Sequence, residues 1–464
     1  MQQGETAVLT HGTITADQSA IGRSAQRKAS WHLIPFIAIG YALAFIDRVN
    51  MSFAALRMNS DLHFSATVYS IGFGIFFIGY ALCEIPSNLM MLRFGARRWL
   101  ARIMMTWGVL ATAMMLVRTP WQFYTVRLLL GIAEAGFFPG VVYYLTLWFP
   151  ARIRARSISR FYIAAPLAST VIGVLAGWLM GLNGTLGLTG WQWLFLVEGI
   201  PPILFGFVIL RVLPDSPAAA SWLTSDEKSW LAAELAKDAS RAHLGHEAGV
   251  LRALLSPKVW IIGLYFFCAL TCNYAYQASG PAILQSVTGW SIGRVGMLTA
   301  VMGLAGAAAM LLAAISSDRT GDRGRHCIVL CCAMGVSFFV ASLAHPAWLV
   351  VAALAVSFIA FFAMLGPGVA VPTEFLAGPA AAAGIAAMNT ITMFSGFLGP
   401  TWMGRTKDLT GTYWLGLRGL LIPSLVAAAL MAYLMRSLAK DKRSAGESPD
   451  HPQANRSVRI ISRP

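Results

Sequence analysis

The fourth long apolar run of the chain contains the stretch Arg127-Leu-Leu-Leu-Gly131-Ile-Ala-Glu134-Ala-Gly136-Phe-Phe-Pro139-Gly140. A helix of roughly 20 apolar residues crosses about 30 Å of hydrocarbon, and this run extends from Phe123 to Leu147. The pattern therefore predicts a membrane-spanning helix that carries an arginine and a glutamate. A charge within a span costs a few kcal/mol or more, so both side chains are expected to face the protein interior and to be functional.

Apolar runs of the same kind recur from Trp31 to about Leu434 and predict roughly twelve spans. The expected spans are Leu33–Ala55, Val68–Leu92, Trp99–Val117, Phe123–Leu147, Ile158–Leu179, Trp193–Leu213, Val259–Gly280, Val295–Ile315, Cys327–Leu343, Ala347–Val371, Ala382–Met403 and Trp414–Met435. Only 12% of the residues are charged, about half the fraction usual in soluble domains, and mean hydropathy is +0.64. A soluble globular protein is therefore excluded.

The spacing of the runs predicts an all-α integral membrane protein with twelve transmembrane helices in two pseudo-symmetric six-helix bundles. The expected parts are a polar cytoplasmic N-terminal tail (1–30), an N-terminal bundle (31–213), a central cytoplasmic loop (214–258), a C-terminal bundle (259–436) and a basic cytoplasmic C-terminal tail (437–464). Within the central loop, Ser225 to Ala239 is typical of a short amphipathic helix with a polar N-terminal cap.

Net charge is +15, and its distribution argues for a membrane rather than for nucleic acid. Arginines gather in alternate connections, whereas the intervening connections carry almost none. The arginine-rich connections contain Arg93, Arg97, Arg98 and Arg102; Arg152, Arg154, Arg156 and Arg160; and Arg319, Arg323 and Arg325. Cytoplasmic loops carry such an excess, so the pattern predicts a multi-pass protein of a bacterial inner membrane with both termini in the cytoplasm. No nucleic acid partner is expected.

All six cysteines fall within or at the ends of apolar runs, where they are expected to be small buried hydrophobic residues. The sequence shows neither a metal-ligand cluster nor a disulfide framework, and residues 1–30 are polar and do not resemble a secretory signal. It also lacks a nucleophile constellation, which argues against a membrane enzyme or sensor. We expect a monomer without a cofactor.

Two pairs of short motifs indicate an internal repeat. Arg93-Phe-Gly95-Ala-Arg97-Arg98 follows the second span, and Asp318-Arg319-Thr-Gly321-Asp-Arg323 follows the eighth. Pro139-Gly140 in the fourth span similarly matches Pro367-Gly368 in the tenth. The loop motifs are expected to anchor the orientation and to gate the cytoplasmic face.

Charged residues in the first and fourth spans are expected to form the central site. Asp47 and Arg48 lie about 20 Å into the first span, at a depth similar to Glu134, while Arg127 lies seven residues before Glu134 on the same helix face. Arginine suits a carboxylate through bidentate hydrogen bonding, and a buried acid can load a proton. Protonation of the acids would free the arginines for an anion. The alternative is an ion-pair network that only holds the two spans together.

Other polar residues within spans are weaker candidates. The residues expected to bind substrate together with Arg48 are Tyr80, Asn273, Tyr274, Gln277 and Asn389. Each could instead make an interhelical polar contact. For Glu84, Glu198 and Glu374, which lie nearer span ends, we favour a structural role.

These motifs resemble the major facilitator superfamily, and within it the anion:cation symporters, closest to the tartrate-transporter-like branch. The resemblance rests on the quoted fourth-span stretch and on five further segments that extend it through nearly the whole chain. They are Phe45-Ile-Asp47-Arg48-Val-Asn50, Glu84-Ile-Pro86-Ser-Asn88, Arg93-Phe-Gly95-Ala-Arg97-Arg98-Trp99, Gly190-Trp191-Gln192-Trp193-Leu-Phe-Leu-Val-Glu198-Gly199 and Ser317-Asp318-Arg319-Thr-Gly321. Family members carry sugar acids, dicarboxylates, phthalate and other aromatic carboxylates.

The resemblance implies roles for individual residues. Asp47 and Glu134 would be proton sites, Arg48 would hold the substrate carboxylate, and Arg127 would couple the two acids. Tyr80 and Asn389 would line the cavity.

The chain also departs from the family's pattern. Leu92 replaces the usual acid before the first loop motif, Phe45 stands where some sugar-acid carriers have tyrosine, and Ala164-Ala165-Pro166 offers no polar side chain in the fifth span. These departures leave room for a less hydroxylated acid.

The function predicted from the sequence is secondary active transport, namely proton-coupled uptake of a small organic acid anion by alternating access. The alternative is a proton-driven antiporter that exports drugs or metabolites. A phosphate-ester antiporter would be expected to place an arginine in each half, and span seven has Asn273 instead.

Overall fold

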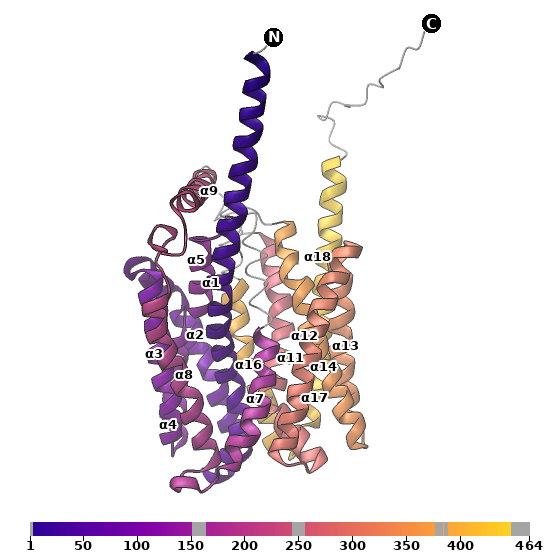
Figure 1. The fold of residues 1–464 in the computed structure, drawn as a ribbon. Helices are drawn as coiled ribbons and strands as arrows, with labels where there is room; N and C mark the ends of the chain where they lie inside the picture. The colour runs from indigo at the N-terminus through magenta and orange to yellow at the C-terminus, as the bar shows by residue number, and fades with distance from the viewer. Residues whose placement is uncertain (1–2, 151–163, 244–255, 376–383, 385–387, 447–464) are drawn as a thin grey trace.

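The computed structural model describes residues 3–150, 164–243, 256–375, 384 and 388–446, and side chains within these ranges except at 3–19, 239–243, 373–374 and 442–446. The expected basic connection at 151–160 and the start of the expected fifth span therefore lie outside the description. Every regular element in the described ranges is a helix (Figure 1).

The helices of the first part of the chain form one side of the molecule in Figure 1. They are α1 (Gln3–Asp61), α2 (Ala66–Phe94), α3 (Ala96–Ala113), η1 (Met114–Leu116), α4 (Pro120–Glu134), α5 (Phe137–Thr146), α7 (Ala164–Gly181), η2 (Thr185–Gly187) and α8 (Gly190–Val212). A connection with η3 (Pro217–Ala219) and α9 (Ser225–His243) follows, and α9 contains the expected amphipathic helix.

The second part of the chain supplies the other side of the molecule. Its helices are α11 (Pro257–Thr288), α12 (Ile292–Thr320), α13 (Arg323–Leu343), α14 (Ala347–Ala370), η4 (Val371–Glu374), α16 (Ser395–Thr410), α17 (Trp414–Gly419) and α18 (Leu421–Gly446). The beginning of α1 and the end of α18 lie at the same end of the helix bundle, which we call the termini face, and the opposite end is called the far face (Figure 1).

Eleven helical segments in the described ranges are long and apolar enough to cross a membrane. The expected eleventh span, Ala382–Met403, overlaps residues outside the description, and its described part is helical at 388–393 and in α16. The first span is longer than expected, because hydrogen bonding continues the helix into polar residues on both sides of the apolar run: its candidate membrane segment covers Ala20–Asp61.

The fourth span is two helices rather than the continuous helix predicted for Phe123–Leu147. α4 ends at Glu134, and α5 begins at Phe137 after Gly136, which has a left-handed φ of 86°. A Cβ at Gly136 would lie 2.4 Å from the Ser87 hydroxyl of α2, so only glycine fits this turn without a shift. The break places Glu134 at the last position of α4.

The two sides of the molecule meet where small residues allow close backbone approach. α7 packs on α12 and α2 packs on α16. A Cβ on Gly296 of α12 would lie 2.0 Å from the carbonyl oxygen of Gly173 in α7. Within a membrane such close packing replaces the hydrophobic driving force between helices, and small residues are the means.

At the termini face, α9 is tied to α1 at Ser24 and Lys28, just before the apolar part of that helix. Glu227 accepts hydrogen bonds from the Ser24 hydroxyl at 2.7 Å and from Lys28 Nζ at 2.9 Å. Burial acts to raise the pKa of Glu227, but these bonds and the Thr224 backbone N–H outweigh it and lower the pKa to about 2. The connection between the two sides is therefore held against the first helix by a charge-assisted contact.

Candidate functional site

A cavity of about 250 Å³ lies between the two sides of the molecule. Its lining residues are Tyr41, Phe45, Arg48, Tyr80, Phe138, Ala165, Phe266, Leu270, Asn273, Tyr274, Phe361, Phe362, Leu365, Val369, Pro372, Met388, Asn389, Thr392 and Met393. Both sides of the molecule contribute to the walls, so a ligand in the cavity contacts both. Most of the lining is apolar, with a few polar groups that could orient a small molecule.

Among the described residues that line the cavity, Arg48 of α1 is the one cation. It forms an ion pair with Glu134, the fully buried residue that ends α4. The guanidinium carbon also lies 5.4 Å from the ring centre of Tyr80, a cation–π contact that holds the side chain over α2. One carboxylate oxygen of Glu134, Oε2, has no hydrogen-bond partner within the described ranges. The pair therefore joins a cavity-facing cation to an incompletely satisfied buried acid.

Asp47 and Arg127 lie behind this pair and do not line the cavity. The Arg127 side chain is buried, and it donates from Nε to the Gly72 carbonyl and from Nη2 to the Phe73 carbonyl, both at 3.2 Å. In the described part of the chain it forms no ion pair with either acid. Asp47, Arg48, Arg127 and Glu134 are nevertheless within electrostatic range of one another. The structure thus brings together the four charges that the sequence singled out.

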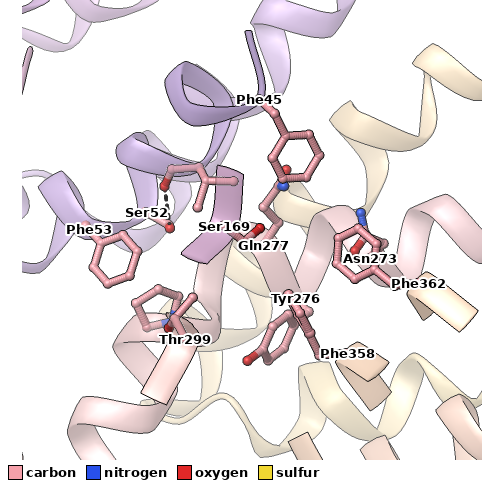
Figure 2. Close-up of a pocket in the computed structure, with 12 residues that line it drawn as sticks. Phe45, Ser52, Phe53, Ser169, Asn273, Tyr276, Gln277, Thr299, Phe358 and Phe362 are labelled. Carbon is pink, nitrogen blue, oxygen red and sulfur yellow. Dashed lines mark hydrogen bonds between the residues drawn. The ribbon is translucent and has the colours of Figure 1, made fainter. Parts of the chain in front are cut away.

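Four of the polar residues predicted to bind substrate, Tyr80, Asn273, Tyr274 and Asn389, share the cavity with Arg48. The fifth, Gln277, instead lines a smaller pocket of about 20 Å³, which has room for about one water molecule. Figure 2 shows Phe45, Asn273 and Phe362 around this smaller pocket, and the same three residues also line the main cavity. They form the partition between the two spaces.

Glu84 has a role that its position near a span end did not indicate. It is 5% exposed and accepts a hydrogen bond from the side-chain amide of Asn389. The contact crosses from α2 to the second part of the chain at the edge of the cavity. Glu84 thus contacts a cavity residue rather than a basic loop. The side chain of Glu374 lies outside the described residues.

The sequence profile of the Major Facilitator Superfamily matches residues 37–400. The chain belongs to the major facilitator superfamily. This confirms the family resemblance of the motifs and the fold of two six-helix bundles, and it makes the protein a multi-pass membrane transporter.

Two relatives and one solved structure show how far the similarity extends. A protein of Agrobacterium vitis whose name refers to tartrate transport is 42% identical over 92% of this chain and 94% of its own. A quinolone resistance transporter of Acinetobacter baumannii is 36% identical over 90% of this chain and 96% of its own. A bacterial homologue of the human lysosomal transporter Spinster, inward-facing and unoccupied, superposes with a TM-score of 0.71 at 18% identity, over 89% of this chain and 98% of its own.

Each of the two loop motifs of this facilitator follows a long helix that ends at a glycine with positive φ. Gly95, with φ 84°, ends α2, and Gly321, with φ 67°, ends α12. In the second motif Asp318 pairs with Arg323 at 3.1 Å. In the first motif Leu92 replaces the acid, and Arg97 pairs instead with Asp215, which follows α8, at 3.3 Å. A carboxylate from another connection thus provides the negative partner that the first motif lacks. Arg93, Arg98 and Arg319 are exposed.

Sequence reasoning missed a buried polar cluster around Asp47. The cluster consists of Asn50 from α1, Trp107 from α3 and Glu198 from α8. Asp47 is faced by Trp107 and Asn50, and Asn50 also faces Glu198. Glu198 is 6% exposed, and none of its carboxylate oxygens or the Asn50 amide atoms has a hydrogen-bond partner in the described ranges. Buried polar groups are rarely left unsatisfied, so the cluster is suited to hold water or a proton next to Asp47. The motif near a span end that contains Glu198 was the signal in the sequence that could have indicated this cluster.

Proposed function

We propose that this facilitator takes up a small organic acid anion, such as tartrate, a sugar acid or an aromatic carboxylate, together with protons. The observation that carries the proposal is the ion pair between cavity-facing Arg48 and buried Glu134. While Glu134 is ionised, its carboxylate occupies the guanidinium. A proton on Glu134 removes that competition, and a substrate carboxylate can then bind Arg48 in the same bidentate manner.

Proton loading and anion binding are thereby linked. The neutralised complex crosses the membrane by rocking of the two six-helix bundles around the cavity, as in alternating access. On the cytoplasmic side the anion leaves, Glu134 releases its proton, and the ion pair with Arg48 forms again. Asp47, with Arg127 in electrostatic range, is a second proton site. Each net positive charge that moves inward gains about 2.3 kcal/mol per 100 mV, so protons in excess of substrate charge would add a voltage drive.

Export of drugs or metabolites in exchange for protons is the second candidate function. It is supported by the relative from Acinetobacter baumannii that is named for quinolone resistance. The same ion pair could load protons in either case. If deprotonation of Glu134 displaces the anion from Arg48, proton and substrate bind and leave together rather than in exchange. This coupling favours symport.

The test is transport by the reconstituted protein in liposomes. Acidification outside should drive accumulation of one of the anions tartrate, gluconate, phthalate or hydroxyphenylacetate, and a protonophore should abolish it. Arg48→Gln should abolish uptake, whereas Glu134→Gln should retain exchange and lose accumulation. Arg118→Gln and Glu234→Gln remove the same charges at exposed or partly exposed positions outside the site and should leave transport unchanged. Normal accumulation by both site variants would exclude the mechanism, and cation expulsion against the pH gradient would favour the antiporter.

A further inference from the structure

We propose that the turn between α2 and α3 binds the headgroup of an anionic phospholipid, such as phosphatidylglycerol. The site lies on the outer surface of the first bundle, at the termini face and outside the cavity. The proposal is independent of the proposed function, because it holds for any substrate and for either direction of transport.

The second loop motif balances its arginines with acids of its own. Asp318 pairs with Arg323 at 3.1 Å, and a carboxylate oxygen of Asp322 lies 3.9 Å from Nε of Arg325. The positive charge of this motif is therefore largely compensated within the protein.

The first loop motif has an excess of positive charge. Arg97 pairs with Asp215 at 3.3 Å. Arg93, Arg98 and Arg102 form no ion pair with any residue in the described part of the chain. Arg93 and Arg98 are exposed and Arg102 is half-buried, so an anion from outside the protein can reach all three.

Two stacked aromatic rings position the guanidinium groups of this turn. The rings of Phe94 and Trp99 are nearly parallel, with centres 5.6 Å apart. The guanidinium carbon of Arg102 lies 4.0 Å from the Trp99 ring centre, and that of Arg93 lies 5.7 Å from the Phe94 ring centre. A guanidinium that stacks on a ring keeps the N–H groups at its edge free to donate to a phosphate. Nε of Arg102 is buried and has no hydrogen-bond partner within the described ranges.

Arg98 and the start of α3 add to the positive field of the turn. Arg98 lies four residues before Arg102, so the two side chains share one face of α3. The first turn of α3, all of it described, contains no acid and receives no side-chain cap. Its N–H groups form the positive end of the helix dipole, which favours an anion. A phosphate oxygen accepts charge-assisted hydrogen bonds from several such donors.

Apolar side chains continue from this turn toward the middle of the membrane. Val109 follows Arg102 by seven residues, nearly two turns, so it shares the same face of α3 about 10 Å deeper. Its side chain is 56% exposed, and that of Leu89, one turn before Arg93 on α2, is 62% exposed. An acyl chain can therefore lie along these residues while its headgroup occupies the turn. This continuity favours a phospholipid over a free phosphate ion.

Lipid binding to the purified full-length protein tests the proposal. The probes are dioleoylphosphatidylglycerol and dioleoylphosphatidylcholine, each titrated against delipidated protein in a neutral detergent, with dissociation constants measured by native mass spectrometry. We expect phosphatidylglycerol to bind about tenfold or more tightly than phosphatidylcholine, whose positive choline group cancels the charge of its phosphate.

Two double variants assign the effect to the first loop motif. Arg98→Gln with Arg102→Gln should weaken phosphatidylglycerol binding about 30-fold, because each arginine contributes about fivefold. Arg319→Gln with Arg325→Gln is the matched control. It removes the same two charges from exposed positions in the second motif, and it should change the affinity by less than about twofold, since Arg325 already has an acid beside it. Gel filtration shows whether each variant remains folded and monodisperse.

Arg98→Lys with Arg102→Lys keeps both charges and removes the planar guanidinium groups. We expect its affinity to lie between those of the unsubstituted protein and the glutamine variant, since lysine attracts a phosphate as a point charge without the stacked, bidentate geometry.

Three outcomes would overturn the proposal. Equal affinities for phosphatidylglycerol and phosphatidylcholine would exclude recognition of the anionic headgroup. Equal losses in the two glutamine variants would show only a general attraction of anionic lipid to the positive face. Displacement of phosphatidylglycerol by inorganic phosphate at a similar concentration would assign the turn to a free anion. None of these measurements involves transport, so the lipid site can be excluded while proton-coupled uptake is confirmed, and the reverse.

Discussion

At the residue scale, Gly136 decides where the fourth span breaks. Its φ of 86° costs an L-residue about 1 kcal/mol, and a Cβ there would meet Ser87, whose hydroxyl is held by a 3.0 Å hydrogen bond from Trp99 Nε1. We therefore expect Gly136→Ala to destabilise the protein by the backbone cost plus about 1–3 kcal/mol of overpacking. The measurement is the thermal unfolding midpoint of the purified protein.

Gly184→Ala is the matched control for this prediction. Its φ is 89°, and no atom lies within 4 Å of the position that a Cβ would take there, so only the backbone cost of about 1 kcal/mol applies. Equal losses of thermal stability in the two variants would show that the contact with Ser87 does not restrict residue 136.

The sequence predicted the charged residues of the site but not their partners. Asp47, Arg48, Arg127 and Glu134 stand out because charges are rare within apolar runs. Their pairing depends on side-chain directions in different helices. The structure joins Arg48 to Glu134 and turns Arg127 to the carbonyls of α2, which no spacing along the chain could show. The neighbours of Asp47 on α3 and α8 were missed for the same reason.

At the element scale, α16 of the second bundle caps the start of α2 in the first, and we expect this contact to close the far face. Both carboxylate oxygens of Asp408 accept backbone N–H groups at the start of α2, from Ala66 at 3.1 Å and from Thr67 at 2.7 Å. A carboxylate suits the N-terminus of a helix, and here it comes from the other bundle. The substitution Asp408→Asn leaves one acceptor oxygen at this side chain and removes its negative charge. It should therefore weaken the contact between the bundles by about 1–2 kcal/mol.

The expected result of Asp408→Asn is a larger population that is open at the far face. Distances between spin labels on the far-face ends of the two bundles should shift toward longer values in the variant. Asp322→Asn weakens a cap within a single helix, where Asp322 accepts from the Arg325 N–H at 3.0 Å, and it should leave the distances unchanged. Identical distance distributions for Asp408→Asn and the unsubstituted protein would contradict a closing role.

The broken fourth span shows what hydropathy could and could not predict about elements. Apolar runs indicated the spans well, because a membrane imposes length and composition on every crossing helix. The break after Glu134 is invisible to hydropathy, since α4 and α5 are both apolar. It depends on the close approach of Gly136 to Ser87 in a neighbouring helix, a tertiary contact.

At the scale of the whole molecule, the internal repeat was readable from short motifs because each copy marks the end of a long helix. Gly95 and Gly321 both end a helix with positive φ, and both motifs pair an arginine with an aspartate. The aspartate belongs to the motif itself in the second copy, Asp318, and to a separate connection in the first, Asp215. The cavity between the bundles was less accessible to sequence reasoning, because its walls combine residues from helices distant in the chain.

The orientation of the molecule in the membrane is predicted by its arginines and can be measured. The loop motifs lie at the turns from α2 to α3 and from α12 to α13, at the same end of the helices as α9, the beginning of α1 and the end of α18 (Figure 1). The positive-inside rule predicts that this face is cytoplasmic. We therefore expect an impermeant maleimide to label Asn183→Cys on intact cells, and to label Asp226→Cys only after permeabilisation.

The labelling requires a background in which the six native cysteines are replaced, because Cys83 and Cys332 are partly exposed. Both test positions are exposed, Asn183 before α8 and Asp226 in α9, so a difference in labelling reports the side of the membrane and not burial. The reverse pattern would place Asp408 and its closed face in the cytoplasm. The contact between Asp408 and α2 would then join the two bundles on the cytoplasmic side, and Asp408→Asn would be expected to favour opening toward the cytoplasm instead of toward the outside.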